Sequence, residues 1–284
     1  MRRVQIRTIN LPGGERLPVL GIGTWNMGEK RRKRADEIAA LQEAIELGMT
    51  VVDTAEMYGD GKAEELVAEA LGSRRSDIFL VSKVMPQHAT RRGTISSCEA
   101  SLRRLKTDRL DMYLLHWRGS VPLDETLEAF QRLHSDGKIR HWGVSNFDAD
   151  DMEELAGLTA RGGSIAATNQ VLYNLTRRGI EYDLLPWCHT RAIPVMAYSP
   201  LEQGLLAGHK TLAAIAKRLN VTPAQVALAW VLRRPGVMAI PKAGSVEHVR
   251  ENHGALQIEM ASKDLAELDE AFPPPTRKRP LEMI

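Results

Sequence analysis

Cysteine is scarce in this sequence. Only Cys98 and Cys188 occur among 284 residues, and their spacing matches neither a metal-ligand pattern nor a redox motif. Each falls in an expected helix, where we interpret it as a half-buried free thiol. The sequence therefore offers no cysteine-based metal or redox site.

Long apolar runs are also missing. After Met1-Arg2-Arg3 the chain alternates Val4, Ile6 and Ile9 with polar residues, which is not the apolar core of a signal peptide. No run approaches the roughly 20 apolar residues that a membrane span needs. We therefore expect a cytoplasmic protein with no membrane partner.

An excess of one charge is missing as well. Lys and Arg number 38 against 36 Asp and Glu, which gives a net charge of +2. The basic runs Lys30–Arg34 and Arg277–Arg279 are short, far apart and free of aromatic residues, so we expect no nucleic-acid partner. With 43% hydrophobic residues and no linker-like stretch, we expect one domain over residues 1–284. We also expect a monomer, although no residue pattern determines the oligomeric state.

What the sequence does contain is a repeat of short apolar runs, each followed by a helical pattern. The runs lie at 19–23, 51–53, 78–83, 110–116, 139–145, 165–170, 193–199 and 236–242. The last residues of these eight runs are Gly23, Asp53, Lys83, His116, Ser145, Gln170, Ser199 and Lys242. Each lies 25 to 43 residues after the one before it. Such spacing is typical of one strand plus one return helix, repeated eight times.

The intervening segments have helical periodicity, as in Ala63, Leu66, Val67, Ala70 and Leu71. The long last gap holds two helices, 211–219 and 223–233, the second beginning at a proline behind Thr222. We predict a (β/α)₈ TIM barrel, with a doubly wound open sheet as the alternative. Residues 4–9 and 16–17 around Pro12-Gly13-Gly14 predict an N-terminal β-hairpin that caps the barrel, and residues 262–271 predict an extra C-terminal helix.

Four residues that can handle a proton lie at or just after strand ends: Asp53, Tyr58, Lys83 and His116. Each alone has an ordinary structural explanation, such as a helix cap, a surface lysine or a core tyrosine. In a barrel, however, neighbouring strands would direct all four into one mouth at the carboxyl ends of the strands. Their joint occurrence is therefore the functional signal.

These four groups suit the reduction of a carbonyl. When hydride reaches the carbonyl carbon, negative charge develops on oxygen and a proton must be supplied. Tyr58 would supply it, and the Lys83 ammonium would lower the pKa of the phenol from its usual value of about 10. Asp53 would keep Lys83 charged and aimed, and His116 would orient the substrate oxygen.

The motifs that carry these residues resemble the aldo-keto reductase family. DTAEMYG (53–59), VSK (81–83) and LLHW (114–117) are similar to its Asp-Tyr-Lys-His motifs, and GIGTW, GVSNF, NQVLYN, AYSPL and IPKA follow in the family's order. LLPWC (184–188) and the short first lid loop resemble bacterial members of the methylglyoxal reductase and diketogluconate reductase kind. The resemblance implies an enzyme that reduces small aldehydes and ketones, 2-oxoaldehydes such as methylglyoxal among them.

No GxGxxG motif opens a strand-helix unit, so a Rossmann fingerprint is absent. The resemblance nevertheless implies a nicotinamide cofactor across the barrel mouth, with Ser145, Asn146 and Gln170 on the carboxamide and Tyr198 stacked on the ring. Without the resemblance, Ser145-Asn146 would be interpreted as a helix cap before Asp148. Further cofactor contacts that the resemblance implies are Gly23, Thr24, Trp25, Asp53, Ser199, Pro200, Leu201, Gly204, Ile240, Lys242, Ala243, Ser245, His248, Glu251 and Asn252.

The adenosine end departs from the family pattern. Ala243 stands where many members have serine, and His248 stands where many have the arginine that grips the 2′-phosphate. Losing a guanidinium there weakens the preference for a phosphorylated cofactor. Because Lys242 remains, with Ser245 and Arg250 nearby, we expect NADP(H) as cofactor, with NAD(H) as the alternative.

The substrate pocket is expected to take Trp25, Tyr58, Met85, His116 and Trp117 from strand ends. Short lid segments at 118–122 and 202–210 suggest an open mouth for small carbonyls. Arg118 could meet an acidic substrate group, although a loop arginine is more often solvated.

Two other functions compete. A barrel that binds the cofactor and regulates a partner with little turnover is one, and the intact Tyr58 and Lys83 argue against it. A metal-dependent hydrolase is the other, but it needs several histidines and carboxylates at strand ends, where only His116 and Asp53 qualify. We therefore expect no metal.

Overall fold

The computed structural model describes residues 6–160 and 165–284. Within them, parallel strands follow one another around a sheet in the order β3 to β10. Their bounds are β3 (Ile22–Gly23), β4 (Val51–Asp53), β5 (Phe79–Val84), β6 (Leu110–Leu115), β7 (Ile139–Ser145), β8 (Asn169–Leu172), β9 (Val195–Tyr198) and β10 (Val237–Ala239). Parallel bridges Leu20–Ala239 and Gly23–Lys242 join the two ends of the sheet. The sheet is therefore a closed barrel, which confirms the predicted fold and excludes the open doubly wound sheet.

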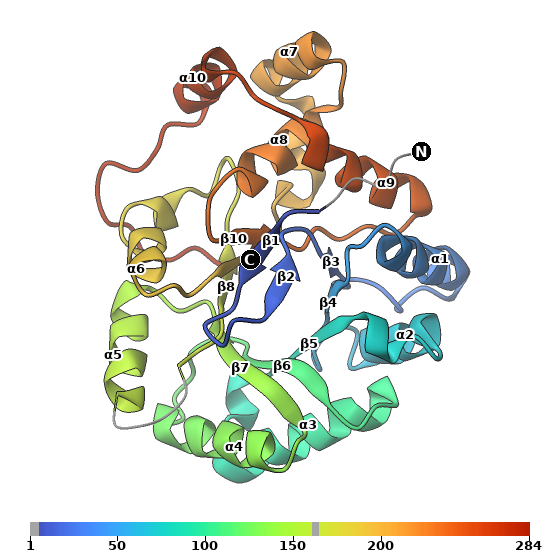
Figure 1. The fold of residues 1–284 in the computed structure, drawn as a ribbon, viewed down its shortest axis with the longest axis vertical. Coiled ribbons are helices and arrows are strands. Elements are labelled where there is room, and N and C mark those ends of the chain that lie inside the picture. Colours follow the sequence, from blue (N-terminus) through green and yellow to red (C-terminus); the bar gives the residue numbers. More distant parts are fainter. Residues whose placement is uncertain (1–5, 161–164) are drawn as a thin grey trace.

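Helices surround the barrel (Figure 1). They are α1 (Arg34–Glu46), α2 (Lys62–Leu71), α3 (Arg91–Leu105), α4 (Leu123–Ser135), α5 (Ala149–Thr159), α6 (Leu184–Thr190), α7 (Lys210–Leu219), α8 (Pro223–Leu232), α9 (Val246–Gly254) and α10 (Ser262–Ala271). Most bury one face only. In α8, by contrast, every residue from Val226 to Leu232 is buried, because α8 contacts α7 and α9 as well as β10.

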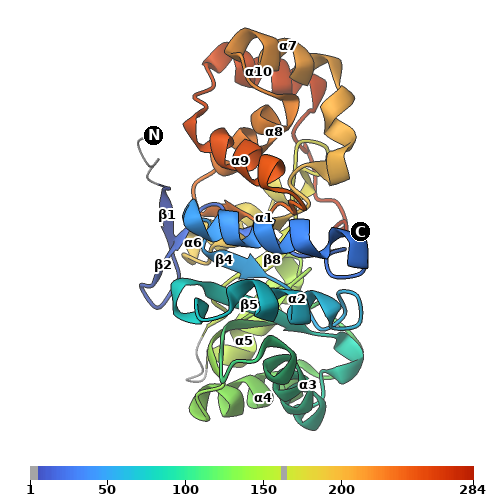
Figure 2. The ribbon, with the colours of Figure 1, turned by 90° about the vertical axis from the view of Figure 1, so that its right-hand side faces the viewer.

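An antiparallel hairpin of β1 (Thr8–Asn10) and β2 (Arg16–Pro18) closes the end of the barrel where the strands begin. Its Leu11 and Leu17 pack with the interior side chains Val51, Val81 and Met112. Figure 2 shows the hairpin on the opposite side of the molecule from the C-terminal end of the chain. The hairpin predicted from sequence is thus present, although its Val4 lies outside the described residues.

Local signals located helix ends better than strand ends. Thr222 caps α8 with a reciprocal bond to Gln225, and α10 spans the predicted residues 262–271. The predicted strand at 165–170 is instead β8 at Asn169–Leu172. The apolar run was correct, but buried Ala166 and Ala167 precede the ladder and do not belong to it.

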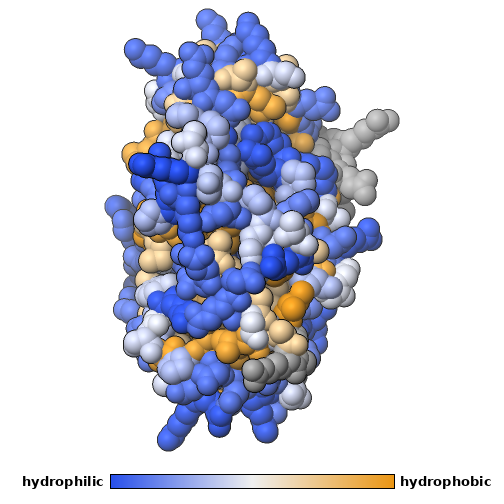
Figure 3. Space-filling model, turned by 90° about the vertical axis from the view of Figure 1, so that its left-hand side faces the viewer, coloured by the Kyte–Doolittle hydropathy of each residue, from blue (hydrophilic) through white to orange (hydrophobic). Residues whose placement is uncertain are grey.

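Both thiols lie in helices, Cys98 in α3 and Cys188 in α6, and each is free and fully buried, not half-buried as expected. The face that presents α5 and α6 is mostly hydrophilic with separated apolar patches (Figure 3). Among the described helices, none has the length and apolar character needed to cross a bilayer.

Candidate active site

Three neighbouring strands bring the predicted proton-handling residues to one end of the barrel. Asp53 ends β4, Lys83 lies near the end of β5, and His116 follows β6 directly. The parallel register pairs Asp53 with Val81 and Lys83 with Leu114. Tyr58 comes from the loop after β4. Because parallel strands end at the same edge, the ladder brings Asp53, Lys83 and His116 together, and the loop after β4 adds Tyr58.

Lys83 is the centre of this group. Its ammonium nitrogen lies 2.8 Å from Asp53 Oδ2, 2.8 Å from the carbonyl oxygen of Thr54 and 3.1 Å from the hydroxyl oxygen of Tyr58. All three donors of the ammonium are therefore used, and the side chain is completely buried. Burial lowers the pKa of Lys83, but Asp53 and Tyr58 outweigh it, so the net pKa is raised and the ammonium stays charged.

The phenol of Tyr58 differs from the sequence expectation in one respect. Lys83 lowers its pKa, as predicted, but burial raises it more strongly and Asp53 adds to the rise. The net pKa of Tyr58 therefore lies above the ordinary value of a tyrosine. Desolvation raises the pKa because the charged phenolate loses far more hydration free energy on burial than the neutral phenol does.

His116 is held neutral. Burial, and secondly the Lys83 charge, lower the pKa of its imidazole to about 2. Its ring centroid lies 5.8 Å from that of Tyr58 and 4.9 Å from that of Trp117. Among the described residues, its Nδ1 atom has no hydrogen-bond partner. A neutral imidazole in this place can donate one hydrogen bond without bringing a charge.

Asp53, Tyr58 and His116 line a cavity of about 890 Å³, and Lys83 lies buried behind them. This size suits an organic ligand. Most residues predicted from sequence line the cavity: Gly23, Trp25, Asp53, Tyr58, His116, Trp117, Ser145, Asn146, Gln170, Tyr198, Ser199, Pro200, Leu201, Gly204, Ile240, Lys242, His248, Glu251 and Asn252. Thr24, Lys83, Met85, Ala243 and Ser245 do not. Thr24 is buried behind the wall and bonds the carbonyl of Asp53, while Ser245 caps α9.

A polar network joins residues of the cavity wall. The Asn146 amide donates to the carbonyl of His116 (3.0 Å) and accepts from the Tyr198 hydroxyl (2.9 Å). Gln170 donates to Asp53 Oδ1 at 2.8 Å, and Ser145 donates to the Gln170 carbonyl at 2.8 Å. Asp148, not Ser145 or Asn146, caps α5. The helix-cap interpretation of Ser145-Asn146 was therefore wrong.

Cationic side chains are distributed unevenly around the rim. Lys242 and His248 are exposed at the far end of the cavity. Arg250 instead turns outward to Glu43 of α1, with its Nε atom 2.8 Å from the carboxylate. Arg118 is held by Glu154 through two bonds of 2.8 and 3.0 Å. Neither arginine is therefore directed into the cavity.

Sequence reasoning missed several lining residues. They are Asn26, Met57, Gln203, Ala224, Pro241, Met283 and Ile284. Met57 lies inside the motif that supplied Asp53 and Tyr58. Its position directly before Tyr58 could have predicted that it lines the same cavity. Met283 and Ile284 arrive from the far end of the chain, and no local pattern marks them.

The barrel and this buried Asp-Lys-Tyr-His group define an oxidoreductase. The aldo/keto reductase family model matches residues 19–272, and the chain belongs to that family. It is 53% identical to "Methylglyoxal reductase YeaE" of Escherichia coli (strain K12), over 99% of this chain and 100% of that protein. It is 33% identical to "Glyoxal reductase" of Bacillus subtilis (strain 168), over 92% and 91%. A crystal structure of an aldo-keto reductase from Klebsiella pneumoniae in complex with NADPH is 50% identical, with a TM-score of 0.94, and covers 99% of this chain and 100% of that one.

Proposed function

We propose that this protein reduces small, uncharged aldehydes and ketones with NADPH, and that 2-oxoaldehydes such as methylglyoxal are among its substrates. The observation that carries the proposal is the buried Lys83 ammonium, 3.1 Å from the Tyr58 hydroxyl and 2.8 Å from Asp53. Its relatives support the proposal, since they include a methylglyoxal reductase and an aldo-keto reductase in complex with NADPH.

The cavity residues fit such a cofactor. Asn146, Gln170 and Ser145 offer amide and hydroxyl groups beside Tyr58, where a carboxamide would be held. Lys242 and His248 at the far end would face a 2′-phosphate, which favours NADPH, with NADH as the alternative. When bound, NADPH supplies the hydride that the protein itself lacks.

Each residue of the inner group then has one task. His116, neutral at physiological pH, donates a hydrogen bond that orients the substrate oxygen. Tyr58 gives its proton to that oxygen as negative charge develops. Lys83, charged because of Asp53, stabilises the phenolate that remains. The raised pKa of Tyr58 keeps the phenol protonated, and hence ready to act as an acid, before the reaction.

The rim supports uncharged substrates. Trp25, Met57 and Met283 are exposed apolar side chains around the mouth. Arg118, which could have met a substrate carboxylate, is occupied by Glu154 and Asp151. We therefore propose that the enzyme prefers methylglyoxal-like carbonyls to sugar acids. We also propose that residues 1–284 act as one catalytic domain. The cytoplasmic location and the monomeric state stay predictions.

The test is the rate of NADPH oxidation with methylglyoxal by Tyr58→Phe. We expect kcat to fall by about 10²- to 10⁴-fold, the usual contribution of a general acid, with the NADPH Kd unchanged. Tyr182→Phe, at a tyrosine that is 49% exposed, is the matched control and should behave as wild type. A fully active Tyr58→Phe would refute the assignment of the acid. NADPH binding with hardly any turnover by the wild type would favour the regulatory alternative.

A further inference from the structure

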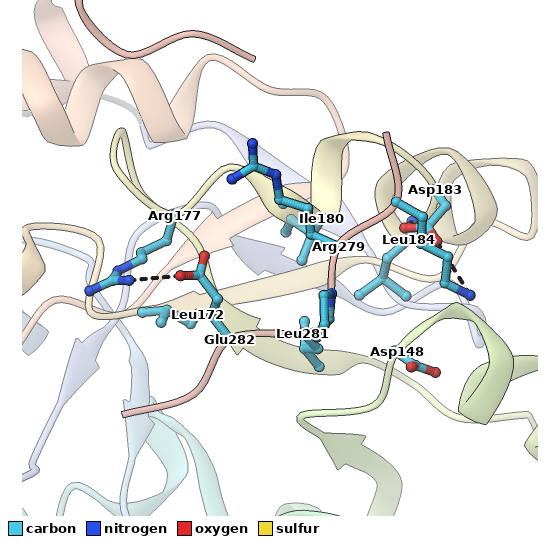
Figure 4. A pocket seen from close by; sticks show the side chains of 12 residues that line it. Asp148, Leu172, Arg177, Ile180, Asp183, Leu184, Arg279, Leu281 and Glu282 are labelled. Atoms are coloured by element: carbon cyan, nitrogen blue, oxygen red, sulfur yellow. Dashed lines mark hydrogen bonds and ion pairs between the residues drawn. The ribbon is translucent and has the colours of Figure 1, made fainter. Parts of the chain in front are cut away.

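The segment after α10, residues 273–284, is strapped across the barrel. Arg178 donates to the carbonyl of Phe272 where the strap begins. Further on, the ammonium of Lys278 lies 2.6 Å from Asp150 and 3.8 Å from Asp183. Figure 4 shows the strap passing Asp183, Leu184 and Leu172 before it reaches Arg177. The strap then delivers Met283 and Ile284 into the wall of the cavity.

A second segment, residues 199–204 after β9, forms an adjoining wall of the cavity. Its backbone adopts an uncommon left-handed conformation at three residues that carry a side chain. The φ angle is 46° at Ser199, 46° at Glu202 and 54° at Gln203, and it is 89° at the following Gly204. Residues with a Cβ adopt such angles only where their surroundings hold them there.

Asn174 and Glu202 provide part of that hold. Asn174, fully buried, donates to the carbonyl of Ser199 (2.9 Å) and to Glu202 Oε2 (2.5 Å). Glu202 is itself only 8% exposed. A carboxylate that is so poorly solvated requires a cation, and the cation is Arg177.

Arg177 contacts both segments with one guanidinium group. Its Nε and Nη2 atoms lie 3.0 Å from Glu202 Oε1, while Nη1 lies 2.7 Å from Glu282 Oε1 of the strap. The Glu282 pair is visible in Figure 4. The fork of an arginine can hold two carboxylates in different directions, which the single ammonium of a lysine cannot do with the same geometry.

We propose that Arg177 is a positioning residue that couples the two walls of the cavity. It holds segment 199–204 against the cofactor and, through Glu282, holds the strap against the substrate. When the cofactor orders segment 199–204, the strap becomes easier to order as well. The reverse also holds, so binding of the cofactor and of the substrate should favour each other. The inference rests on the proposed function, in which those ligands are NADPH and a small carbonyl.

The test is a double-mutant cycle read out as NADPH Kd, from quenching of tryptophan fluorescence in the absence of substrate. Arg177→Met should raise the Kd by roughly five- to tenfold, the low end of coupling between sites. Glu282→Gln, which lies on the strap, should raise it by about two- to fivefold, as expected for an exposed ion pair. In the Arg177→Met background, Glu282→Gln should add nothing, because the link is already broken.

Lys278→Met is the matched control. It loosens the same strap but removes no contact of Arg177. The KM for methylglyoxal should rise, and any rise in the NADPH Kd should pass through Arg177 and therefore vanish in the Arg177→Met background. Arg177→Lys keeps the charge and guards against misfolding of Arg177→Met. It should fold as wild type and still lose the effect of Glu282→Gln on the Kd.

The outcomes separate this inference from the proposed function. If the wild type bound no NADPH, the proposed function would fail. If it bound NADPH and either Glu282→Gln or Lys278→Met raised the Kd equally with and without Arg177, only the role of Arg177 would be refuted.

Discussion

The inner corner of the cavity and its outer rim are held in different ways. The inner corner, Asp53, Tyr58, Lys83 and His116, is fixed by a strand ladder and by bonds among buried groups. The outer rim, residues 199–204 and 242–252 with Met283 and Ile284, is built from loops, a helix start and the strap. Loss of one partner in the corner leaves a buried charge, whereas exposed rim groups such as Lys242 and His248 keep their contact with water. Under the proposed function, chemistry is therefore placed on the rigid part and ligand exchange on the adaptable part.

The largest expected effect is in the corner. Lys83→Met leaves the carboxylate of Asp53, which is 2% exposed, without its cation. We expect a loss of about 3–5 kcal/mol in the free energy of unfolding, as for other broken buried pairs, together with loss of turnover. Urea unfolding measures the first and NADPH oxidation the second.

The double variant Asp53→Asn with Lys83→Met is the control for that loss. It should recover much of the stability, since no unpaired charge stays buried, but none of the activity. Equal stability of Lys83→Met and the wild type would show that the corner is as adaptable as the rim.

A smaller effect concerns His116 and pH. Its pKa is about 2 in the folded protein and about 6.5 in an unfolded chain. Below pH 6.5 the His116 imidazole binds a proton in the unfolded state but stays neutral in the folded state. The free energy of unfolding of the wild type therefore falls as the pH falls. At pH 5 this loss amounts to about 2 kcal/mol.

His116→Gln removes the titrating group. Between pH 7.5 and pH 5, the free energy of unfolding of this variant should therefore fall by about 2 kcal/mol less than that of the wild type. Thermal unfolding of both proteins over that range measures the difference, and all other titrating groups cancel in it. Parallel pH profiles for the two proteins would mean that water reaches the imidazole.

The smallest effect is expected near the rim. Arg118→Ala breaks an ion pair in which Glu154 is 51% exposed, so we expect at most about 1 kcal/mol in stability. Because Arg118 is turned to Glu154 and Asp151, the KM should stay the same for neutral and acidic carbonyls alike. If the KM of Arg118→Ala rose for acidic substrates alone, Arg118 would contact the substrate and would belong to the functional part of the rim.

The sequence predicted the corner well because short-range patterns sufficed. Apolar runs located the strands, and each functional residue stood at or just after the end of a run. It predicted the rim less well. Met283 and Ile284 follow no strand, and Arg250 was counted near a phosphate although Glu43, far away in sequence, draws it to α1. The start of β8 was also misplaced, since an apolar run does not reveal where a ladder begins.

By itself the sequence determined the order of strands and helices, the closed barrel and the family motifs, because these depend on periodicity and on neighbouring residues. Only the tertiary structure decided how much burial raises the pKa of Tyr58, which arginines are turned away, and which distant segments form the walls. Such properties arise from groups that are far apart along the chain and meet only after folding.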